Sequence, residues 1–433
     1  MENSRKEASY DALVVGGGIA GIETALNIAN NGFKVLLVEK DLSIGGKMIL
    51  LSKVFPTLDC AACITTPKVS EVSRHPGITI FTSSEVQWLE KSADRKFLAR
   101  IRKKPRYVIA EDCTGCQLCE QACPVVTTDE YQMNLVGRKA AFIPFSIASP
   151  RIAAIDIENC TLCGACEKVC PTKCIDFTQT EEYLEVEIKT VVVATGFNLF
   201  DPLRIPRYGF GLYKNVITSM QMERQLAPTR PFHTILRPGD GKVPDKVAYV
   251  LCTGSRDATI GNPVCSQICC MYSVKQAQLL MGALPMADVT IYYIDIRAFG
   301  KGFNEFYQQA QGMGVNFVKG KVAKITEKTN GNLLLRYEDV LSGTLREAEH
   351  DLVVLSVGVL PNQDPLKYFQ DQSLQADNFQ FVRQADPLAS PSLTSIPGVF
   401  VAGTASGPMD IPDSILSAGA ASSEAISYIS EKK

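Results

Sequence analysis

Two short runs of cysteines are the part of the sequence whose residue types point most directly to chemistry. Each run has the spacing C-x2-C-x2-C-x3-C followed by proline, and thiolates at this spacing bind [4Fe–4S] clusters, which carry single electrons. The fourth cysteine of such a run ligates the other cluster. This sharing predicts one cluster bound by Cys113, Cys116, Cys119 and Cys170, and a second bound by Cys160, Cys163, Cys166 and Cys123. Structural zinc, the alternative, is normally bound by separate C-x2-C pairs.

A third group of cysteines follows an apolar segment at 247–251. Cys252 ends this segment, and Cys265, Cys269 and Cys270 open a predicted helix. Ligands of open α/β sheets bind at the carboxyl ends of the strands, so four thiols there favour a third [4Fe–4S] cluster. Neighbouring residues of a regular helix point in different directions, so the predicted cluster geometry is irregular. Burial of some of these thiols as small apolar side chains is the alternative.

Cys60 and Cys63 form a further C-x2-C pair. Such a pair can be a redox-active dithiol, part of a cluster site completed by cysteines from elsewhere, or two packed thiols. The sequence leaves these alternatives open, and we treat both residues as candidate catalytic groups. Cys174 lies four residues beyond the second run and is expected to be structural.

The glycines near the start of the chain predict a dinucleotide site. An apolar strand from Asp11 runs into Gly16-x-Gly18-x-x-Gly21, a helix follows, and a second strand ends at Glu39. This order is that of a βαβ nucleotide-binding unit. The glycines allow a pyrophosphate to approach the backbone and the helix N-terminus, and the acid binds ribose hydroxyls.

Later segments of the sequence indicate that the bound nucleotide is FAD. Gly45-Gly46-Lys47 resembles the second glycine pair of FAD-binding proteins of the disulfide-reductase type, and 190–196 resembles their returning strand with its Ala-Thr-Gly turn. The segment 396–404 resembles their C-terminal flavin motif, although Thr404 replaces the usual Asp. A helix predicted at 411–430 would direct its positive end toward the flavin. The candidate FAD-binding residues are Gly16, Gly18, Gly21, Glu39, Gly46, Lys47, Thr195, Gly196, Gly403 and Thr404.

These motifs predict an α/β, two-domain flavoprotein like disulfide reductases and thioredoxin reductases, with an inserted α+β ferredoxin domain of the bacterial 2[4Fe–4S] type. Beyond the strand at 247–251 only Gly254 remains of a glycine fingerprint, so the second nucleotide site is predicted to be degenerate. The expected domains are three FAD-binding segments at 1–105, 181–245 and 376–433, the ferredoxin insertion at 106–180, and an NAD(P)H-domain-like unit at 246–375.

Composition excludes several other classes of function. The 433 residues carry a formal net charge of −2, which gives no electrostatic reason to expect nucleic acid as a partner. No apolar run is long enough to insert into a membrane, and the first residues do not resemble a signal peptide. Fifteen cysteines without an export signal indicate a reducing compartment, and we expect the cytoplasm.

The chain resembles the A subunit of heterodisulfide reductase. The resemblance rests on residues 55–63, both cysteine runs, the Cys-Cys-Met-Tyr-Ser segment within 265–275, and the Asp-Ile-Arg-Ala-Phe-Gly segment within 293–302. It implies an FAD that distributes or bifurcates electrons, a cluster at the third cysteine group, and Lys275 near the flavin as a candidate catalytic residue. Full-length relatives add an N-terminal cluster domain and a C-terminal ferredoxin domain, so a compact form is expected here.

The same resemblance implies protein partners. These are other subunits of a heterodisulfide-reductase-like complex and electron donors or acceptors of the ferredoxin, hydrogenase or dehydrogenase type; a homodimer within the complex is compatible with it. Two alternatives stay open at this point. The chain could be a stand-alone NAD(P)H-dependent iron–sulfur flavoprotein reductase, or an electron conduit whose flavin does not turn over.

Overall fold

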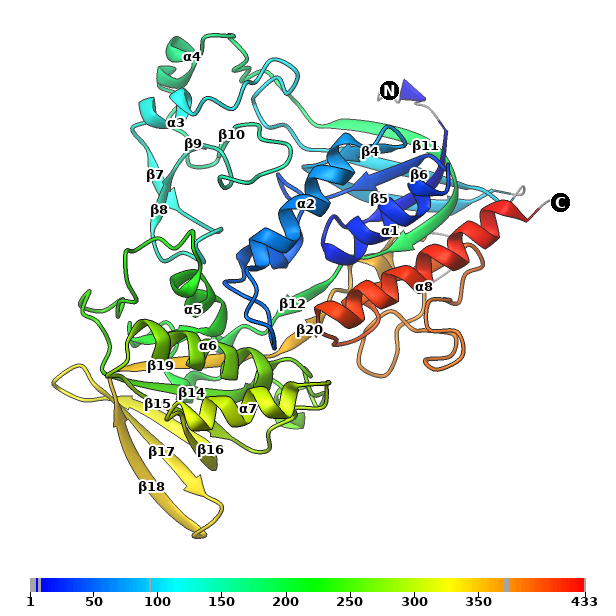
Figure 1. The fold of residues 1–433 in the computed structure, drawn as a ribbon. Coiled ribbons are helices and arrows are strands. Elements are labelled where there is room, and N and C mark those ends of the chain that lie inside the picture. Colours follow the sequence, from blue (N-terminus) through cyan, green and yellow to red (C-terminus); the bar gives the residue numbers. More distant parts are fainter. Residues whose placement is uncertain (1–4, 7–8, 93–94, 370–373, 432–433) are drawn as a thin grey trace.

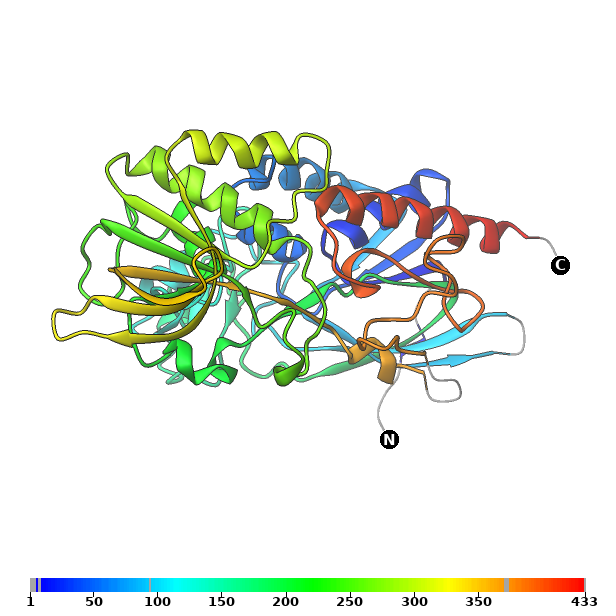
Figure 2. The ribbon, with the colours of Figure 1, turned by 90° about the horizontal axis from the view of Figure 1, so that it is seen from below.

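The computed structural model describes residues 5–6, 9–92, 95–369 and 374–431. Two large sheets, each covered by helices, lie side by side, and a smaller unit projects beyond the first sheet (Figure 1). Figure 2 shows α8 of the first sheet and α6 and α7 of the second along the same side of the molecule. No helix in the described ranges combines the length and apolar composition that crossing a membrane requires.

The first sheet has the strand order β4-β3-β2-β11-β6-β5, and β1 and β21 also pair with β11. Its strands are β1 (Arg5–Lys6), β2 (Tyr10–Val15), β3 (Val35–Val38), β4 (Ile78–Phe81), β5 (Ser84–Lys91), β6 (Phe97–Lys103), β11 (Glu182–Val193) and β21 (Val399–Val401). In this sheet β11 pairs in parallel with β2 and β21, and β3 pairs in parallel with β2 and β4. Strand β6 is antiparallel to both of its neighbours, β11 and β5. Strands buried on both faces are apolar throughout, as Leu-Val-Val in β2 and Val-Leu-Leu-Val in β3 illustrate.

Helices cover one face of this sheet. They are α1 (Ile19–Asn30), α2 (Ala61–Arg74) and α8 (Ile411–Ser430). α1 and α8 lie against each other, although nearly four hundred residues separate them in the chain (Figure 1). Small and branched side chains such as Ala25, Ile28 and Ala421 fill their interface, which lets the helices pack closely over the nucleotide-binding strands.

The segment between β6 and β11 forms the smaller unit. It contains α3 (Leu118–Ala122), α4 (Ala165–Val169), β7 (Val126–Thr128), β8 (Gly137–Lys139), β9 (Ala141–Phe142) and β10 (Ala154–Ile155). Lys103 at the end of β6 pairs with Glu182 at the start of β11, so the chain leaves and re-enters the sheet at neighbouring positions. An insertion at such a point does not disturb the pairing of the flanking strands.

The second sheet has the order β13-β19-β14-β15-β16-β17-β18. Its strands are β13 (Val216–Thr218), β14 (Lys246–Thr253), β15 (Asp288–Tyr293), β16 (Asn316–Glu327), β17 (Leu333–Asp339), β18 (Thr344–His350) and β19 (Leu352–Val357), and its helices are α5 (Ser219–Leu226), α6 (Cys269–Ala283) and α7 (Phe303–Gly312). β12 (Phe197–Leu199) and β20 (Val359–Pro361) pair where the chain passes between the two sheets.

Candidate functional site

The predicted FAD-binding residues meet at one edge of the first sheet. β2, β11 and β21 are neighbouring parallel strands, and β3 lies on the other side of β2. Gly16, Glu39, Thr195 and Gly403 follow the ends of these strands, so their backbones lie at the same carboxyl edge. This is the edge at which open α/β sheets bind their ligands.

Close packing or a positive φ explains the other glycines at this edge, but neither explains Gly18. A Cβ on Gly21 would lie 1.8 Å from the carbonyl oxygen of Gly16, and one on Gly46 would lie 2.7 Å from the Cα of Gly18. A Cβ on Gly18 would meet only the Cα of Gly46, at 3.9 Å, and the backbone of Gly18 is extended with φ −74°. The fold itself therefore does not require glycine at position 18, whereas a pyrophosphate approaching the start of α1 does.

Polar groups around the glycines also fit FAD. The carboxylate of Glu39 is buried and accepts hydrogen bonds from the backbone N–H groups of Gly17 (2.6 Å) and Asp41 (2.9 Å), and burial raises its pKa to about 7. The hydroxyl of Thr195 is buried and has no hydrogen-bond partner among the described residues. An unpartnered buried hydroxyl beside a glycine turn is expected where a polar cofactor completes the site.

The remaining predicted FAD residues line the same region. The ammonium of Lys47 lies 4.8 Å from the centre of the Phe197 ring, and burial lowers its pKa. The hydroxyl of Thr404 would lie 3.9 Å from a Cβ on Gly196, so the Ala-Thr-Gly turn and the C-terminal motif face each other. α8 begins shortly afterwards, capped by Asp410, whose carboxylate accepts from the N–H of Asp413.

Replacing Gly18 by alanine should weaken FAD binding without disturbing the fold. The new methyl group fits the apo chain but occupies the space that the pyrophosphate needs, so we expect the Kd for FAD to rise at least about tenfold, which is about 1.4 kcal/mol. Flavin fluorescence titration of the apo protein measures this. Gly282→Ala, in open space at the end of α6, is the matched control. Unchanged FAD affinity in Gly18→Ala would contradict the placement of the pyrophosphate.

In the smaller unit, the structure places the first predicted cysteine set around one cavity and three members of the second set near one another. One cavity is lined by Cys113, Cys116, Cys119 and Cys170, the first predicted set. The thiol of Cys166 is buried close to Cys160 and Cys123, which belong to the second set. Burial raises the pKa of Cys119 to about 12, and the neighbouring Cys113 and Cys116 add to this effect. Cys174 also lines the first cavity, with its sulfur 3.4 Å from that of Cys170.

Three cysteines of the third group, Cys252, Cys269 and Cys270, lie close together near the end of β14. Cys252 has a left-handed backbone with φ 56° and lies where the pairing of β14 with β19 shifts register, between Val250 and Thr253. Cys269 and Cys270 are the first two residues of α6. The prediction that Cys265 opens this helix is wrong: Cys265 lies in the preceding loop, where its sulfur accepts from the N–H of Gln267 at 3.4 Å. A hydrogen bond from Cys269 lowers the pKa of Cys252 to about 7.

The donor chemistry of these groups suits iron–sulfur clusters. Among the described residues, no three His, Cys, Asp or Glu side chains converge tightly enough to hold one metal ion. A [4Fe–4S] cube makes a different demand, because each thiolate binds a separate iron at a corner of the cube. The hydroxyl of Ser255, which lines the same pocket as Cys252, is buried without a hydrogen-bond partner among the described residues and could donate to such a group.

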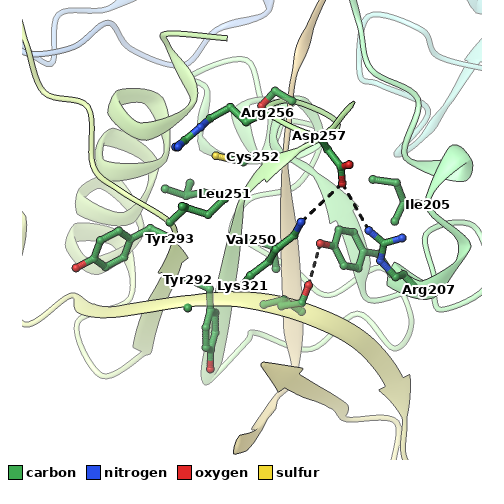
Figure 3. Close-up of a pocket in the computed structure, with 15 residues that line it drawn as sticks. Ile205, Arg207, Val250, Leu251, Cys252, Arg256, Asp257, Tyr292, Tyr293 and Lys321 are labelled. Carbon is green, nitrogen blue, oxygen red and sulfur yellow. Dashed lines mark hydrogen bonds and ion pairs between the residues drawn. The ribbon is translucent and has the colours of Figure 1, made fainter. Parts of the chain in front are cut away.

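Within the described part of the second sheet, the turn after β14 contains one glycine and no glycine-rich run. The predicted remnant of a fingerprint, Gly254, follows β14, and a Cβ there would lie 2.0 Å from the ring of Phe200. Packing against this ring therefore explains the glycine without any nucleotide. Figure 3 shows the adjoining pocket at the ends of β14 and β15 and beside the middle of β16. In this pocket the carboxylate of Asp257 lies 3.9 Å from the guanidinium of Arg207 and 3.8 Å from the ammonium of Lys321.

Lys275 lies in a buried polar network that joins the two sheets. Its ammonium donates to the carboxylate of Glu223 (2.6 Å) and to the carbonyl oxygen of Lys53 (2.8 Å). Glu223 also accepts from Gln276 and from the backbone and hydroxyl of Ser52. Burial alone would favour neutral Glu223, but the charge of Lys275 and these hydrogen bonds lower its pKa. Glu223 belongs to no sequence motif, and a single glutamate in a short helix normally faces solvent. Its burial in this network could therefore not be predicted from the sequence.

Cys60 and Cys63 lie at the start of α2. Cys60 is the N-cap residue, and its sulfur accepts the N–H of Cys63 at 3.3 Å. The side chain of Cys63 is exposed. Burial opposes ionisation of Cys60, but hydrogen bonds from the Cys63 thiol and backbone outweigh it and lower the pKa of Cys60. The hydrogen bond to Cys60 raises the pKa of Cys63. The pair is thus accessible from outside the chain.

Comparison with known proteins agrees with this arrangement. Relatives include the A subunit of the H(2):CoB-CoM heterodisulfide,ferredoxin reductase of Methanothermobacter thermautotrophicus, which is 41% identical over 98% of this chain. An iron–sulfur A subunit of the CoB--CoM heterodisulfide reductase of Methanopyrus kandleri is 43% identical over 98%. The chain spans 65% of the length of both relatives. The predicted resemblance to this type of protein is confirmed.

The fold is shared with thioredoxin reductases. The alignment with the thioredoxin reductase of Lactococcus lactis covers 97% of this chain and 99% of that enzyme, with a TM-score of 0.55 and 15% sequence identity. The predicted two-domain α/β flavoprotein fold is therefore confirmed, while the ferredoxin character of the smaller unit stays a prediction. Residues 10–425 match the family described as pyridine nucleotide-disulphide oxidoreductase. The chain is thus an oxidoreductase and belongs to the pyridine nucleotide-disulphide oxidoreductase family.

Proposed function

We propose that the chain is the FAD- and iron–sulfur-dependent electron-transfer component of a heterodisulfide-reductase-like complex. One observation carries this proposal: the end of β14, where a nicotinamide nucleotide would need a glycine-rich turn, instead presents Cys252 opposite Cys269 and Cys270. Four thiols, counting Cys265, are the ligands that a [4Fe–4S] cluster needs. With a cluster at this position, the chain receives and passes on electrons through its FAD and its iron–sulfur clusters rather than through a nicotinamide nucleotide.

Two kinds of cofactor define the chemistry: FAD exchanges electrons in pairs or singly, and [4Fe–4S] clusters carry single electrons. The residues at the edge of the first sheet hold the nucleotide, and the cysteines of the smaller unit and of β14 and α6 bind the clusters. Lys275 is proposed to act on the flavin as a hydrogen-bond donor. An ammonium has three N–H donors, and two of them bind Lys53 and Glu223 among the described residues.

The network around Glu223 supports this role of Lys275. Ser52 and Lys53 follow the turn of residues 46–50 that begins at the second glycine pair, and both contact the network. Glu223 therefore fixes the lysine ammonium next to a segment that leads directly from the proposed FAD site. A fixed positive charge there stabilises an anionic reduced flavin.

Distribution of electrons between two acceptors, including bifurcation, is part of the proposal, as are partner proteins that hold the terminal substrate. Support comes from the relatives, whose names describe one component of a heterodisulfide reductase. Cys60 and Cys63 lie at the surface, where either a dithiol or a cluster shared with a partner chain can form. The rival function is a stand-alone NAD(P)H-dependent reductase, which the family name itself favours.

Anaerobically prepared protein should contain about twelve irons, in three [4Fe–4S] clusters, and one FAD per chain. Iron and flavin analysis, together with electron paramagnetic resonance of the reduced protein, measures this content. About eight irons in a folded, FAD-containing protein would contradict the cluster at β14. About sixteen would mean that Cys60 and Cys63 take part in a fourth cluster.

A further inference from the structure

Arg256 adjoins the third cysteine group in an unusual backbone conformation. Both Cys252 and Arg256 have φ 56°, a left-handed backbone conformation that residues other than glycine rarely adopt. Strained residues of this kind persist where the surrounding structure holds them, and they concentrate at functional sites. The backbone N–H of Arg256 donates to the carbonyl oxygen of Val264 at 3.0 Å, which fixes the loop immediately before Cys265.

Asp295 holds the side chain of Arg256. One guanidinium nitrogen lies 2.7 Å from the Asp295 carboxylate, which also accepts from Arg297 at 3.3 Å. The backbone carbonyl of the same Asp295 accepts the thiol of Cys270 at 3.6 Å. Arg256 and Cys252 line one pocket and lie next to each other in Figure 3. One arginine is thus tied to the surroundings of Cys252, Cys265 and Cys270.

We propose that Arg256, positioned by Asp295, raises the reduction potential of the cluster bound by Cys252, Cys265, Cys269 and Cys270. This inference rests on the proposed function. One-electron reduction adds a negative charge to the cluster without making or breaking a bond, and a fixed cation beside a ligating sulfur stabilises the reduced form more than the oxidised form. Asp295 does not cancel this effect, because it is shared by two arginines and the three groups together keep one positive charge.

The other cations of the pocket are less suited to this role. The side chains of Arg207 and Lys321 are 44% and 57% exposed, against 21% for Arg256, so solvent and salt screen their charges more strongly. Both face the carboxylate of Asp257. Arg207 therefore offers a matched control: its removal deletes one positive charge from the same pocket without touching the cysteines.

Potentiometric titration with dithionite, followed by paramagnetic resonance, tests the inference on the FAD-containing protein. In Arg256→Gln the equilibrium constant for reduction of this cluster should fall about tenfold, a potential about 59 mV lower for a one-electron couple. Arg256→Lys should fall between the wild type and Arg256→Gln, and Arg207→Gln should titrate like the wild type. The same potential in Arg256→Gln and wild type would overturn the inference.

Further outcomes separate this inference from the proposed function. The absence of any cluster assigned to the third cysteine group in the wild-type protein would refute the proposed function and the inference together. If Arg256→Gln does not assemble the cluster, Arg256→Met is titrated in its place, with the same expectation. If only Arg256→Lys assembles it, arginine serves assembly rather than potential, and the inference is wrong although the cluster assignment stands.

Discussion

Replacing Cys265 or Cys269 by serine is expected to remove one cluster and to leave FAD and the other two clusters in place. Cys265 and Cys269 lie in the loop and helix between β14 and β15 of the second sheet, whereas the FAD edge and the smaller unit belong to separate parts of the fold. A serine hydroxyl is a poor substitute for a thiolate as a ligand to iron. The iron content should therefore fall from about twelve to about eight per chain.

Iron analysis, flavin content and paramagnetic resonance of the two variants measure this loss. Cys174→Ser is the control, because Cys174 is buried beside Cys170 but is not a predicted ligand, and it should keep all three cluster signals. Circular dichroism shows whether each variant is folded. Retention of the full cluster complement in Cys265→Ser and Cys269→Ser would make these thiols core cysteines and remove the basis for the third cluster.

Local sequence signals predict the first nucleotide unit well. The helix predicted after the glycine turn spans Ile19–Asn30, and the second predicted strand spans Val35–Val38, directly before Glu39. Apolar strands, a glycine turn and a terminal acid are all encoded within about thirty residues, so no distant contact is needed to recognise them. The long helix at the C-terminus is predicted as well, because its periodicity and Pro412 mark it locally.

Features that depend on distant contacts could not be predicted. Helix α6 begins at Cys269 rather than at Cys265, because Gln267 has a left-handed backbone with φ 60° and the hydroxyl of Ser266 is tied to the N–H of Val359, a residue 93 positions later. Gly254 resembles the remnant of a phosphate-binding turn, but it packs against Phe200, which lies more than fifty residues earlier in the chain.

Only one partner of the buried ion pair between Lys275 and Glu223 could be predicted from the sequence. A family resemblance identifies Lys275, whereas its partner Glu223 lies on another helix and has no motif of its own. A buried carboxylate is stable only with several hydrogen bonds, and here they come from Ser52, Lys275 and Gln276, which lie far from Glu223 in the chain. Only the folded chain brings these together.

The isolated chain is expected to be a poor NAD(P)H oxidase. A nicotinamide nucleotide needs a turn whose backbone can approach its pyrophosphate, and the turn after β14 has only Gly254, which is packed against an aromatic ring. Cys252 lies near the carboxyl end of β14, where open α/β sheets bind their ligands, and a cluster bound there would exclude a nucleotide. The negative charge of such a cluster would also repel the phosphates of NADH or NADPH. Electrons should instead enter from a protein donor.

The central claim is that the second sheet carries a cluster in place of a nicotinamide nucleotide, and anaerobic flavin reduction tests it most directly. The FAD absorbance of the cluster-containing protein is followed after mixing with NADH, with NADPH, or with a reduced ferredoxin. We expect rapid bleaching by reduced ferredoxin and bleaching at least about a hundredfold slower by either nicotinamide, a difference of about 2.7 kcal/mol in activation free energy. Rapid, saturable bleaching by NADH or NADPH without any partner protein would contradict the claim.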